Sequence, residues 1–322
     1  MSRRSLLAGM AIAVFAASAL AQSDYPNRPI RLLVPFAPGG GTDLTARMVA
    51  ERLRLELGQA VVVDNRPGAA GTLGSVAAMR AAPDGYTILF TTSTNQIIAP
   101  LLMETAPYDG ARDFAPVSLL IRYGGVLLVS TSFPGRTFQE FVAYARQRPG
   151  KLNYASSGIG STNHLLGEML KNRTGMELVH VPYKGSAPAV QALASDEVQV
   201  FFDTIPSAQN WLKQGRVKVL ATTGETRTSL MPEAPTLVEL GVFDGSTDYW
   251  MGLAMPPGTP SPIVGKVREA VSRMMASPEM MDFAAKGGGE GAAGSSEQFG
   301  KLLLEEQRRW GELIRKNHIR AE

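Results

Sequence analysis

Short apolar runs alternate with longer amphipathic stretches along most of the chain, which is the pattern of parallel strands joined by crossover helices. The strands predicted in the first half are residues 30–36, 60–64, 86–91 and 115–121. Those predicted in the second half are residues 125–130, 152–156, 178–182, 198–203 and 217–222, with one more at residues 249–255. The pattern predicts an α/β protein whose two halves repeat one scheme, although no residue-level repeat is visible.

Helical periodicity is clearest directly after the first predicted strand. Five apolar residues share one helical face there: Ala46, Val49, Ala50, Leu53 and Leu57. Gly58 is predicted to end this helix. Further helices are predicted at residues 138–147, 163–173, 187–195 and 208–214. The last helix is predicted to begin at a capping box formed by Ser295 and Gln298.

Two stretches of the chain are long enough to pass between two lobes, residues 115–130 and residues 222–255. Two crossings make the first domain discontinuous. We therefore expect domain 1 to comprise residues 22–123 plus 227–322, and domain 2 to comprise residues 124–226. The lobes would be hinged by two extended segments, with a cleft between the carboxyl ends of their strands, where open α/β sheets bind ligands.

Residues 1–21 are predicted to be a signal peptide. Arg3 and Arg4 precede an apolar stretch at residues 6–20, and Ala19-Leu20-Ala21 matches an A-x-A cleavage pattern. The mature chain would begin at Gln22 in the periplasm, exported by the Sec or the twin-arginine route. A short membrane anchor is the alternative interpretation, although the apolar stretch is shorter than a typical membrane span.

Composition excludes several function classes. The formal net charge of the 322 residues is only +3, and no cluster of lysines and arginines alternates with aromatic residues, so a nucleic acid partner is not expected. The chain has no cysteine, which removes disulfides, thiolate chemistry and cysteine-based metal sites. The three histidines lack metal-ligand spacing, so neither a metal nor a cofactor is predicted.

Glycine- and serine-rich turns join a strand to a helix in both halves, and such turns expose backbone N–H groups where a helix dipole favours an anion. In the first half the candidate binding residues are Phe36, Gly39, Gly40, Gly41 and Asp43. In the second half they are Ser157, Gly160, Ser161, Thr162 and His164. The alternative interpretation is a flexible turn capped by Thr42 or Asp43 and an ordinary cap at Ser161 or Thr162, with His164 on the surface.

Four more candidates follow strands at the same predicted sheet edges. Ser93 and Asn95 lie at the edge of the triglycine turn, Asp203 ends a strand beside Ser157, and Lys184 could attract an acidic ligand unless it is merely solvated. Catalysis is a weaker interpretation. Ser157, His164 and Asp203 could be read as a hydrolase triad, but no G-x-S-x-G elbow surrounds the serine.

Seven segments, in their order and spacing, resemble the substrate-binding proteins of tripartite tricarboxylate transporters, the Bug or TctC family. They are Tyr25–Arg31, Val34–Asp43, Asp64–Gly71, Pro83–Thr87, Ser156–Glu168, Val181–Gly185 and Trp250–Pro260. The resemblance covers nearly the whole mature chain. Among its departures, Ile159 stands where many relatives carry a polar residue.

The resemblance implies a two-lobed periplasmic binding protein of type II-like fold that closes on its ligand. It implies a small carboxylate ligand, held at Gly39–Gly41, at Ser157–Thr162 and at Asp203, and it implies no enzymatic activity. The expected partners are a large and a small membrane subunit of the transporter, and the binding protein itself is expected to be a monomer. A sensing subunit that hands its ligand-bound state to a receptor is the alternative function.

Overall fold

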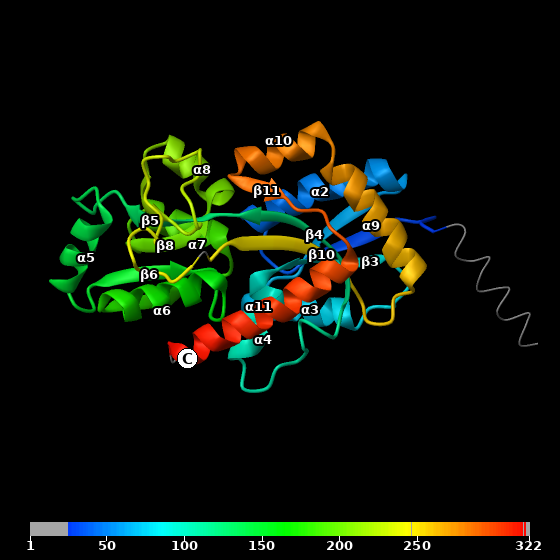
Figure 1. Cartoon of the computed structure of the whole chain (residues 1–322), viewed down its shortest axis with the longest axis horizontal. Helices are drawn as coiled ribbons and strands as arrows, with labels where there is room; N and C mark the ends of the chain where they lie inside the picture. Colours follow the sequence, from blue (N-terminus) through cyan, green and yellow to red (C-terminus); the bar gives the residue numbers. More distant parts are fainter. Residues whose placement is uncertain (1–24, 246, 318, 320–322) are drawn as a thin grey trace, which may run out of the picture.

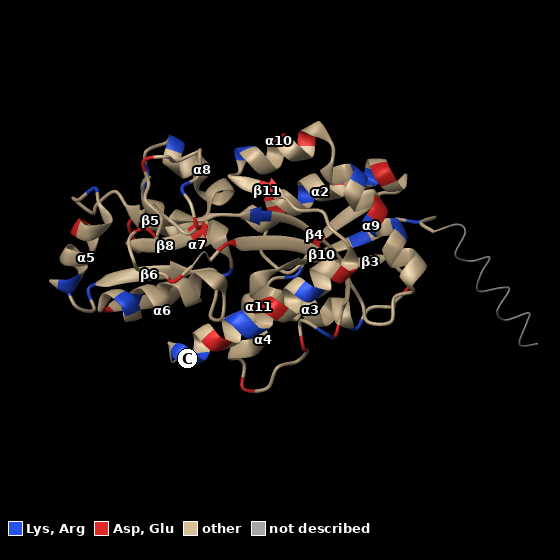
Figure 2. Cartoon of the chain, in the orientation of Figure 1, with Lys and Arg blue, Asp and Glu red and all other residues tan. Residues whose placement is uncertain are grey.

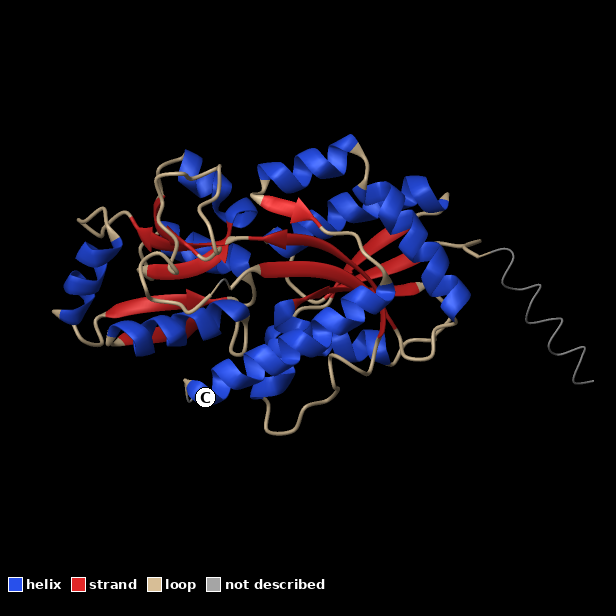
Figure 3. Ribbon diagram, viewed as in Figure 1, coloured by secondary structure: helices blue, strands red, loops and turns tan. Residues whose placement is uncertain are grey.

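A computed structural model describes residues 25–245, 247–317 and 319 of the chain. Two mixed sheets lie end to end along the long axis, each flanked by helices (Figures 1 and 3). We call the six-stranded sheet with its helices the first lobe, and the five-stranded sheet with its helices the second lobe. The predicted signal peptide, residues 1–21, lies outside the described residues. No helix of the described segments is long and apolar enough to span a membrane.

The sheet of the first lobe has the strand order β11-β4-β10-β3-β1-β2. Its strands are β1 (Ile30–Val34), β2 (Val61–Asn65), β3 (Thr87–Thr92), β4 (Ala115–Tyr123), β10 (Tyr249–Met255) and β11 (Gly289–Gly291). Strand β1 pairs in parallel with both β2 and β3, whereas β10 runs antiparallel between β3 and β4. The late strand β10 therefore returns the chain to the middle of the first sheet.

The sheet of the second lobe has the order β7-β6-β8-β5-β9. Its strands are β5 (Gly125–Ser130), β6 (Leu152–Ser156), β7 (Leu178–Pro182), β8 (Val200–Thr204) and β9 (Val217–Thr222). Strands β6, β7 and β8 are parallel, and β5 is antiparallel to its neighbours β8 and β9. Both sheets thus contain mostly parallel strands and one long antiparallel strand near the crossing, which confirms the predicted fold class.

Ten α-helices and two short helical turns complete the described part of the chain. The helices are α2 (Gly41–Leu57), α3 (Thr72–Met79), α4 (Ala99–Leu102), α5 (Phe138–Arg146), α6 (Thr162–Thr174), α7 (Ser186–Ala194), α8 (Ile205–Lys213), α9 (Ser261–Met275), α10 (Pro278–Lys286) and α11 (Ser296–Lys316). The turns are η1 (Ala69–Gly71) and the π-helical η2 (Thr94–Ile98). Acidic and basic residues are interspersed along α11 and along helices of both lobes (Figure 2).

Strand alternation explains why helices cover both faces of the second sheet. Successive side chains of a strand point to opposite faces, and Phe201 and Phe202 of β8 accordingly belong to different buried clusters. Phe201 packs with apolar residues of α7 and α8, and Phe202 packs with those of α6. Because both faces are covered, the strand ends are where a ligand can reach the second lobe.

The chain crosses between the lobes twice, and the two crossings lie side by side. Strand β4 passes directly into β5 through Gly124, and the return path enters β10 at Tyr249. The Thr223 amide donates to the Gly125 carbonyl at 2.9 Å, and the Thr247 amide donates to the Thr223 carbonyl at 3.0 Å. These hydrogen bonds tie the two connections into one narrow hinge.

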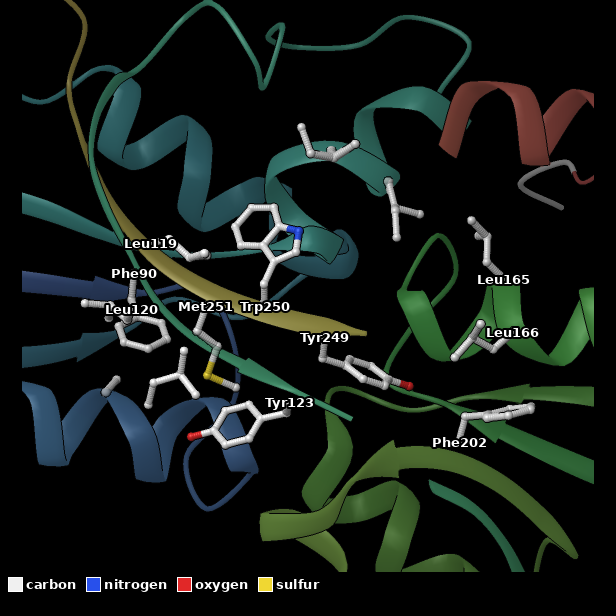
Figure 4. Close-up of a cluster of buried hydrophobic side chains, with 14 of the residues drawn as sticks. Phe90, Leu119, Leu120, Tyr123, Leu165, Leu166, Phe202, Tyr249, Trp250 and Met251 are labelled. Carbon is white, nitrogen blue, oxygen red and sulfur yellow. The ribbon is translucent and has the colours of Figure 1, made fainter. Parts of the chain in front are cut away.

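A buried apolar cluster runs through this hinge from one sheet to the other. Figure 4 shows Tyr123, Trp250 and Met251 on the first-lobe side, and Tyr249 extending toward Phe202 of the second lobe. Tyr249 is only 8% exposed. The strand that closes the hinge therefore also forms the floor between the lobes.

Candidate functional site

A small cavity lies between the lobes at the carboxyl ends of the parallel strands. Its volume is about 40 Å³, enough for a few water molecules. The lining residues are Phe36, Ala37, Gly40, Gly41, Thr42, Thr92, Ser93, Thr94, Ser157, Asn163, Ser186, Asp203, Thr204, Tyr249, Trp250 and Met251. Both predicted turns contribute to this cavity, from opposite sides.

Four helices begin at the cavity. Gly41 and Thr42 open α2, Asn163 lies in the first turn of α6, and Ser186 opens α7. Thr204 precedes α8 as its N-cap residue. The first N–H groups of a helix have no partner within the helix, and the dipole places partial positive charge there. Their convergence makes this cavity favourable for a negatively charged group.

The triglycine turn allows the lobes to approach closely. Gly40 is the N-cap of α2, and no side chain caps this helix. A Cβ atom on Gly41 would lie 2.9 Å from Thr204 Oγ1 of the second lobe, closer than real Cβ contacts allow. Glycine at this position is therefore required for the lobes to meet as they do here.

Asp43 fixes the triglycine turn from behind and does not line the cavity. Its Oδ2 accepts hydrogen bonds from the Gly39 amide and from Arg47 Nε, both at 2.9 Å, and its Oδ1 accepts from Asn65 Nδ2 at 2.9 Å. Burial alone would raise the pKa of Asp43, but the bonds from Arg47, Gly39 and Asn65 together hold it below its usual range. Asp43 thus lies inside the helix and holds the preceding loop, so the interpretation of Asp43 as the helix cap was wrong.

The second turn contacts the first lobe directly. The Thr162 and Thr94 hydroxyls lie 2.8 Å apart, and the Thr162 amide donates to Thr94 Oγ1 at 3.1 Å. Ser93 Oγ is 3.2 Å from the Thr162 hydroxyl. Ser157 donates to Asn163 Oδ1, and Asn163 in turn donates to the Phe202 carbonyl. These contacts join the lobes beside the cavity and order its serine-rich wall.

Asp203 is a buried carboxylate with an incomplete set of partners. Its Oδ1 accepts from the Thr204 amide at 2.8 Å, whereas its Oδ2 is buried without a hydrogen-bond partner in the described residues. Burial raises the pKa of Asp203 to about 6, against the smaller opposing effects of the Ser207 hydroxyl and the Thr204 amide. A perturbed acid aimed at a cleft is a common mark of a functional site.

A second, larger cavity of about 260 Å³ adjoins the first and shares Phe36 and Ser157 with it. Its other lining residues are Pro35, Pro67, Gly68, Ala69, Ala70, Gly71, Gly158, Ile159, Pro182, Tyr183 and Lys184. We call the two spaces the inner and the outer cavity. The outer cavity is largely apolar, and Lys184 is the cation among its lining residues.

The structure distributes the predicted site residues over four places. Those that line the inner cavity are Phe36, Gly40, Gly41, Ser93, Ser157 and Asp203. Those that support or seal it without lining it are Gly39, Asp43, Asn95, Gly160, Ser161 and Thr162. Lys184 lines the outer cavity, and His164 lines a separate surface groove. Because His164 faces that groove, it does not join Ser157 and Asp203 in a triad.

Several cavity residues were missed in the sequence. Thr204, Thr94 and Asn163 adjoin predicted residues, Ser186 lies two positions after Lys184, and each stands where a parallel strand gives way to a helix. That position could have identified them. Tyr249, Trp250 and Met251 could not be found this way, because they reach the cavity on the antiparallel strand β10. Within the described residues, no group of three histidine or acidic side chains could hold a metal ion.

Comparison with known proteins agrees with this geometry. Residues 45–319 match the tripartite tricarboxylate transporter family receptor. Protein BugT of Bordetella pertussis is 32% identical over 317 residues, 98% of this chain and 97% of that protein.

Two solved structures from Rhodopseudomonas palustris are similar over most of the chain. Rpa4515 with adipate is 35% identical with a TM-score of 0.89, covering 92% of this chain and 99% of that one. MatC with bound malate is 32% identical with a TM-score of 0.85, covering 90% and 100%. The chain therefore belongs to the tripartite tricarboxylate transporter receptor family, whose members are periplasmic solute-binding proteins.

Proposed function

We propose that this protein captures a small carboxylate in the periplasm and delivers it to the large and small membrane subunits of a tripartite transporter. The observation that carries the proposal is the convergence of four helix N-termini on the inner cavity, with wall residues from both lobes. Similar proteins hold adipate and malate, both of which are dicarboxylates. The proposed lobes are residues 22–123 plus 227–322, and residues 124–226.

One carboxylate of the ligand would occupy the inner cavity, which has room for little more than such a group. Gly41, Asn163, Ser157 and Ser186 line this space, so their backbone N–H groups and the two serine hydroxyls would be the donors to that carboxylate. Asp203, when protonated, would donate one more hydrogen bond to the ligand. Hydrogen bonds to a charged group contribute roughly 1.5–3 kcal/mol each before ordering costs, so a few of them suffice for micromolar affinity.

The rest of the ligand would extend into the outer cavity. Its apolar lining suits a short carbon chain or ring, and Lys184 could attract a second negative group at the far end. Ile159, which lines this space, would favour carbon over a hydroxyl at its side. We infer a dicarboxylate or an aromatic acid of modest size as the ligand class.

Closure would follow from ligand contacts made with both lobes at once. Only the closed arrangement brings Gly41 and Thr204 together around one solute, so a ligand bound there shifts the population toward the closed state. The closed surface would then be the form that the membrane subunits recognise.

A thermal-shift screen of the mature chain tests the ligand class. The panel contains adipate, malate, citrate and benzoate, with adipamide as the uncharged match for adipate. At 100 times its dissociation constant a ligand adds about 2.7 kcal/mol to stability. We expect at least one acid to raise the melting temperature, and adipamide to have no effect. A panel without any stabilising acid, or an equal shift with adipamide, would contradict the proposal.

A further inference from the structure

Behind the serine-rich turn, the buried His164 and the half-buried His180 form a pair that does not line the inner or the outer cavity. We propose that His164 and His180 are positioning residues, which hold the turn Ser157–Gly160 in its ligand-binding shape only while His164 is neutral. This inference rests on the proposed function, because the turn is a wall of the proposed ligand site. It predicts that acidification weakens ligand binding through His164.

His164 accepts a hydrogen bond from the C-terminal end of the turn, at Gly160. The Gly160 backbone amide donates to His164 Nδ1 at 3.2 Å. An amide nitrogen is always a donor, so Nδ1 must carry no proton in this arrangement. Gly160 itself has a φ of +79°, a left-handed conformation that the rest of the turn must maintain.

His180 supports the N-terminal part of the turn, at Gly158, through the hydroxyl of Ser156. Its Nε2 lies 2.7 Å from Ser156 Oγ, and that oxygen accepts a hydrogen bond from the Gly158 amide at 3.1 Å. The backbone amides on either side of Ile159 are thus both bonded on the side of the histidines. The Gly160 amide donates to His164, and the Gly158 amide donates to Ser156, which contacts His180. Gly158 lines the outer cavity, so the rear contacts fix a surface that the ligand touches.

The two imidazole rings are stacked on each other, with centroids 4.3 Å apart, and the Tyr154 ring stacks on the far side of His180 at 4.8 Å. Burial and, to a smaller extent, a charge on His164 lower the pKa of His180 to about 4, against the opposing effect of the Glu168 carboxylate. His180 therefore stays neutral at physiological pH, so any proton that the pair takes up near that pH has to reside on His164.

The charged groups around the pair are Glu168, Lys171 and Arg173 of α6 and Lys316 of α11, with the Tyr154 hydroxyl on β6. Although burial alone would raise it, the pKa of Glu168 is lowered by its bonds from Lys171 and Tyr154, so Glu168 is ionised. A positive charge on His164 lowers the pKa of Glu168 as well, so this carboxylate interacts with the pair besides its two hydrogen-bond partners. The net environment thus provides one compensated carboxylate and several cations, which does not favour a second positive charge on the rings.

A proton can reach His164 from a surface groove that is separate from the two ligand cavities. His164 and His180 line a groove of about 910 Å³ on the other side of the turn. His164 is only 4% exposed, but it lies at the floor of this groove. Protonation there would place Nδ1–H against the Gly160 N–H, two donors facing each other, and would push the turn out of its ligand-binding shape.

The test compares the wild type with His164→Asn, because the Oδ1 of asparagine can replace Nδ1 as an acceptor and does not titrate. Binding of adipate and malate is measured by calorimetry from about pH 8 to about pH 5, the range in which histidines titrate. We expect wild-type affinity to fall at least tenfold more than that of His164→Asn. Both proteins share the titration of the ligand and of Asp203, so the difference isolates His164. Equal pH profiles would overturn the proposal.

His164→Leu and His180→Gln complete the series. The leucine removes the acceptor, so weak binding is expected at every pH, whereas the glutamine can replace Nε2 and should leave the pH profile close to wild type. If His164→Leu bound with wild-type affinity at pH 8, the positioning role would be wrong.

A second measurement needs no ligand. The amide resonances of Gly160 and Gly158 are followed by nuclear magnetic resonance over the same pH range. The Gly160 signal should move with the His164 titration in the wild type and stay fixed in His164→Asn. A fixed Gly160 signal in the wild type contradicts the inference even if no carboxylate binds, and a moving one with no binding carboxylate refutes only the proposed function.

Discussion

Asp43 and Asp203 lie in different lobes with the same burial, 2% exposed each, and with opposite electrostatics. Asp43 in the first lobe satisfies both carboxylate oxygens with a guanidinium, an amide and a side-chain amide, and its pKa is lowered. Asp203 in the second lobe leaves one oxygen without a partner, and its pKa is raised to about 6. Asp43 supports a loop. Asp203 is a buried carboxylate with one uncompensated oxygen, and a carboxylate perturbed in this way is a common mark of a functional site.

The largest effect expected from this contrast between the two aspartates is on the free energy of unfolding. The rise of the Asp203 pKa from 3.8 to about 6 corresponds to about 3 kcal/mol of destabilisation by the ionised form. Asp203→Asn should therefore raise the free energy of unfolding by about 3 kcal/mol at pH 8. Below pH 3.8 the aspartate is protonated in both states, so the advantage should disappear, having declined as the pH falls from about 6. Denaturant unfolding at several pH values measures this, and a destabilised variant at pH 8 would contradict the contrast.

The second test keeps both aspartates and prevents their loops from meeting. Gly41→Val places carbon against Thr204 Oγ1 and Ser207 of the other lobe. We expect carboxylate affinity to fall at least about 100-fold, or about 2.7 kcal/mol. The melting temperature without ligand should change little, because the clash arises only on closure.

The matched control for this variant is Gly265→Val, since a Cβ at Gly265 meets no atom within 4 Å. Full carboxylate binding by Gly41→Val would show that close approach of the lobes is not needed.

A smaller effect is expected for Asp43, whose two carboxylate oxygens both accept hydrogen bonds. Asp43→Asn keeps the shape but removes the charge that pairs with Arg47, and should lower the free energy of unfolding by about 1–2 kcal/mol at pH 7. Because the Asp43 pKa is lowered on folding, its contribution is present above the unfolded pKa and is lost as the pH falls through the folded value. The comparison is sharpened if, at pH 7 to 8, Asp203→Asn raises the free energy of unfolding and Asp43→Asn lowers it. Changes of the same sign in the two variants would contradict it.

The smallest expected effect concerns the hydroxyl contact that joins the two lobes beside the inner cavity. Thr94→Val is nearly isosteric and removes the hydrogen bonds to Thr162 across the cleft. One hydrogen bond contributes about 1 kcal/mol, so carboxylate affinity should fall roughly fivefold. Thr91→Val, in the preceding strand β3 and bonded within the first lobe to Gln96, is the control and should bind normally.

Much of the fold was predictable from sequence because each strand carries its own apolar signal. The strands at 125–130, 152–156, 178–182, 217–222 and 249–255 were confirmed at their predicted bounds. The capping box of Ser295 and Gln298 was confirmed as well. Strand β11, in contrast, consists of two glycines and a glutamate and pairs through its backbone, so no side-chain pattern announces it.

The site was predicted at the level of its turns and less well at the level of single side chains. Residue 164 follows Thr162 by two positions, which turns it by about 200° around the helix axis. Thr162 faces the first lobe, so His164 must face away from it. Thr94 was missed because a polar run looks like a loop, whereas it forms a π-helical turn whose hydroxyl reaches the other lobe.

The contact between Thr94 and Thr162 also has a kinetic consequence. On the proposed function, a solute whose carboxylate is held by both lobes would be released only once that pair has separated, because the lobes meet beside the inner cavity. Escape then requires the whole molecule to open first. Residence times of chemically different solutes should converge on the opening rate, so selectivity among them would be expressed mainly in how fast each is captured.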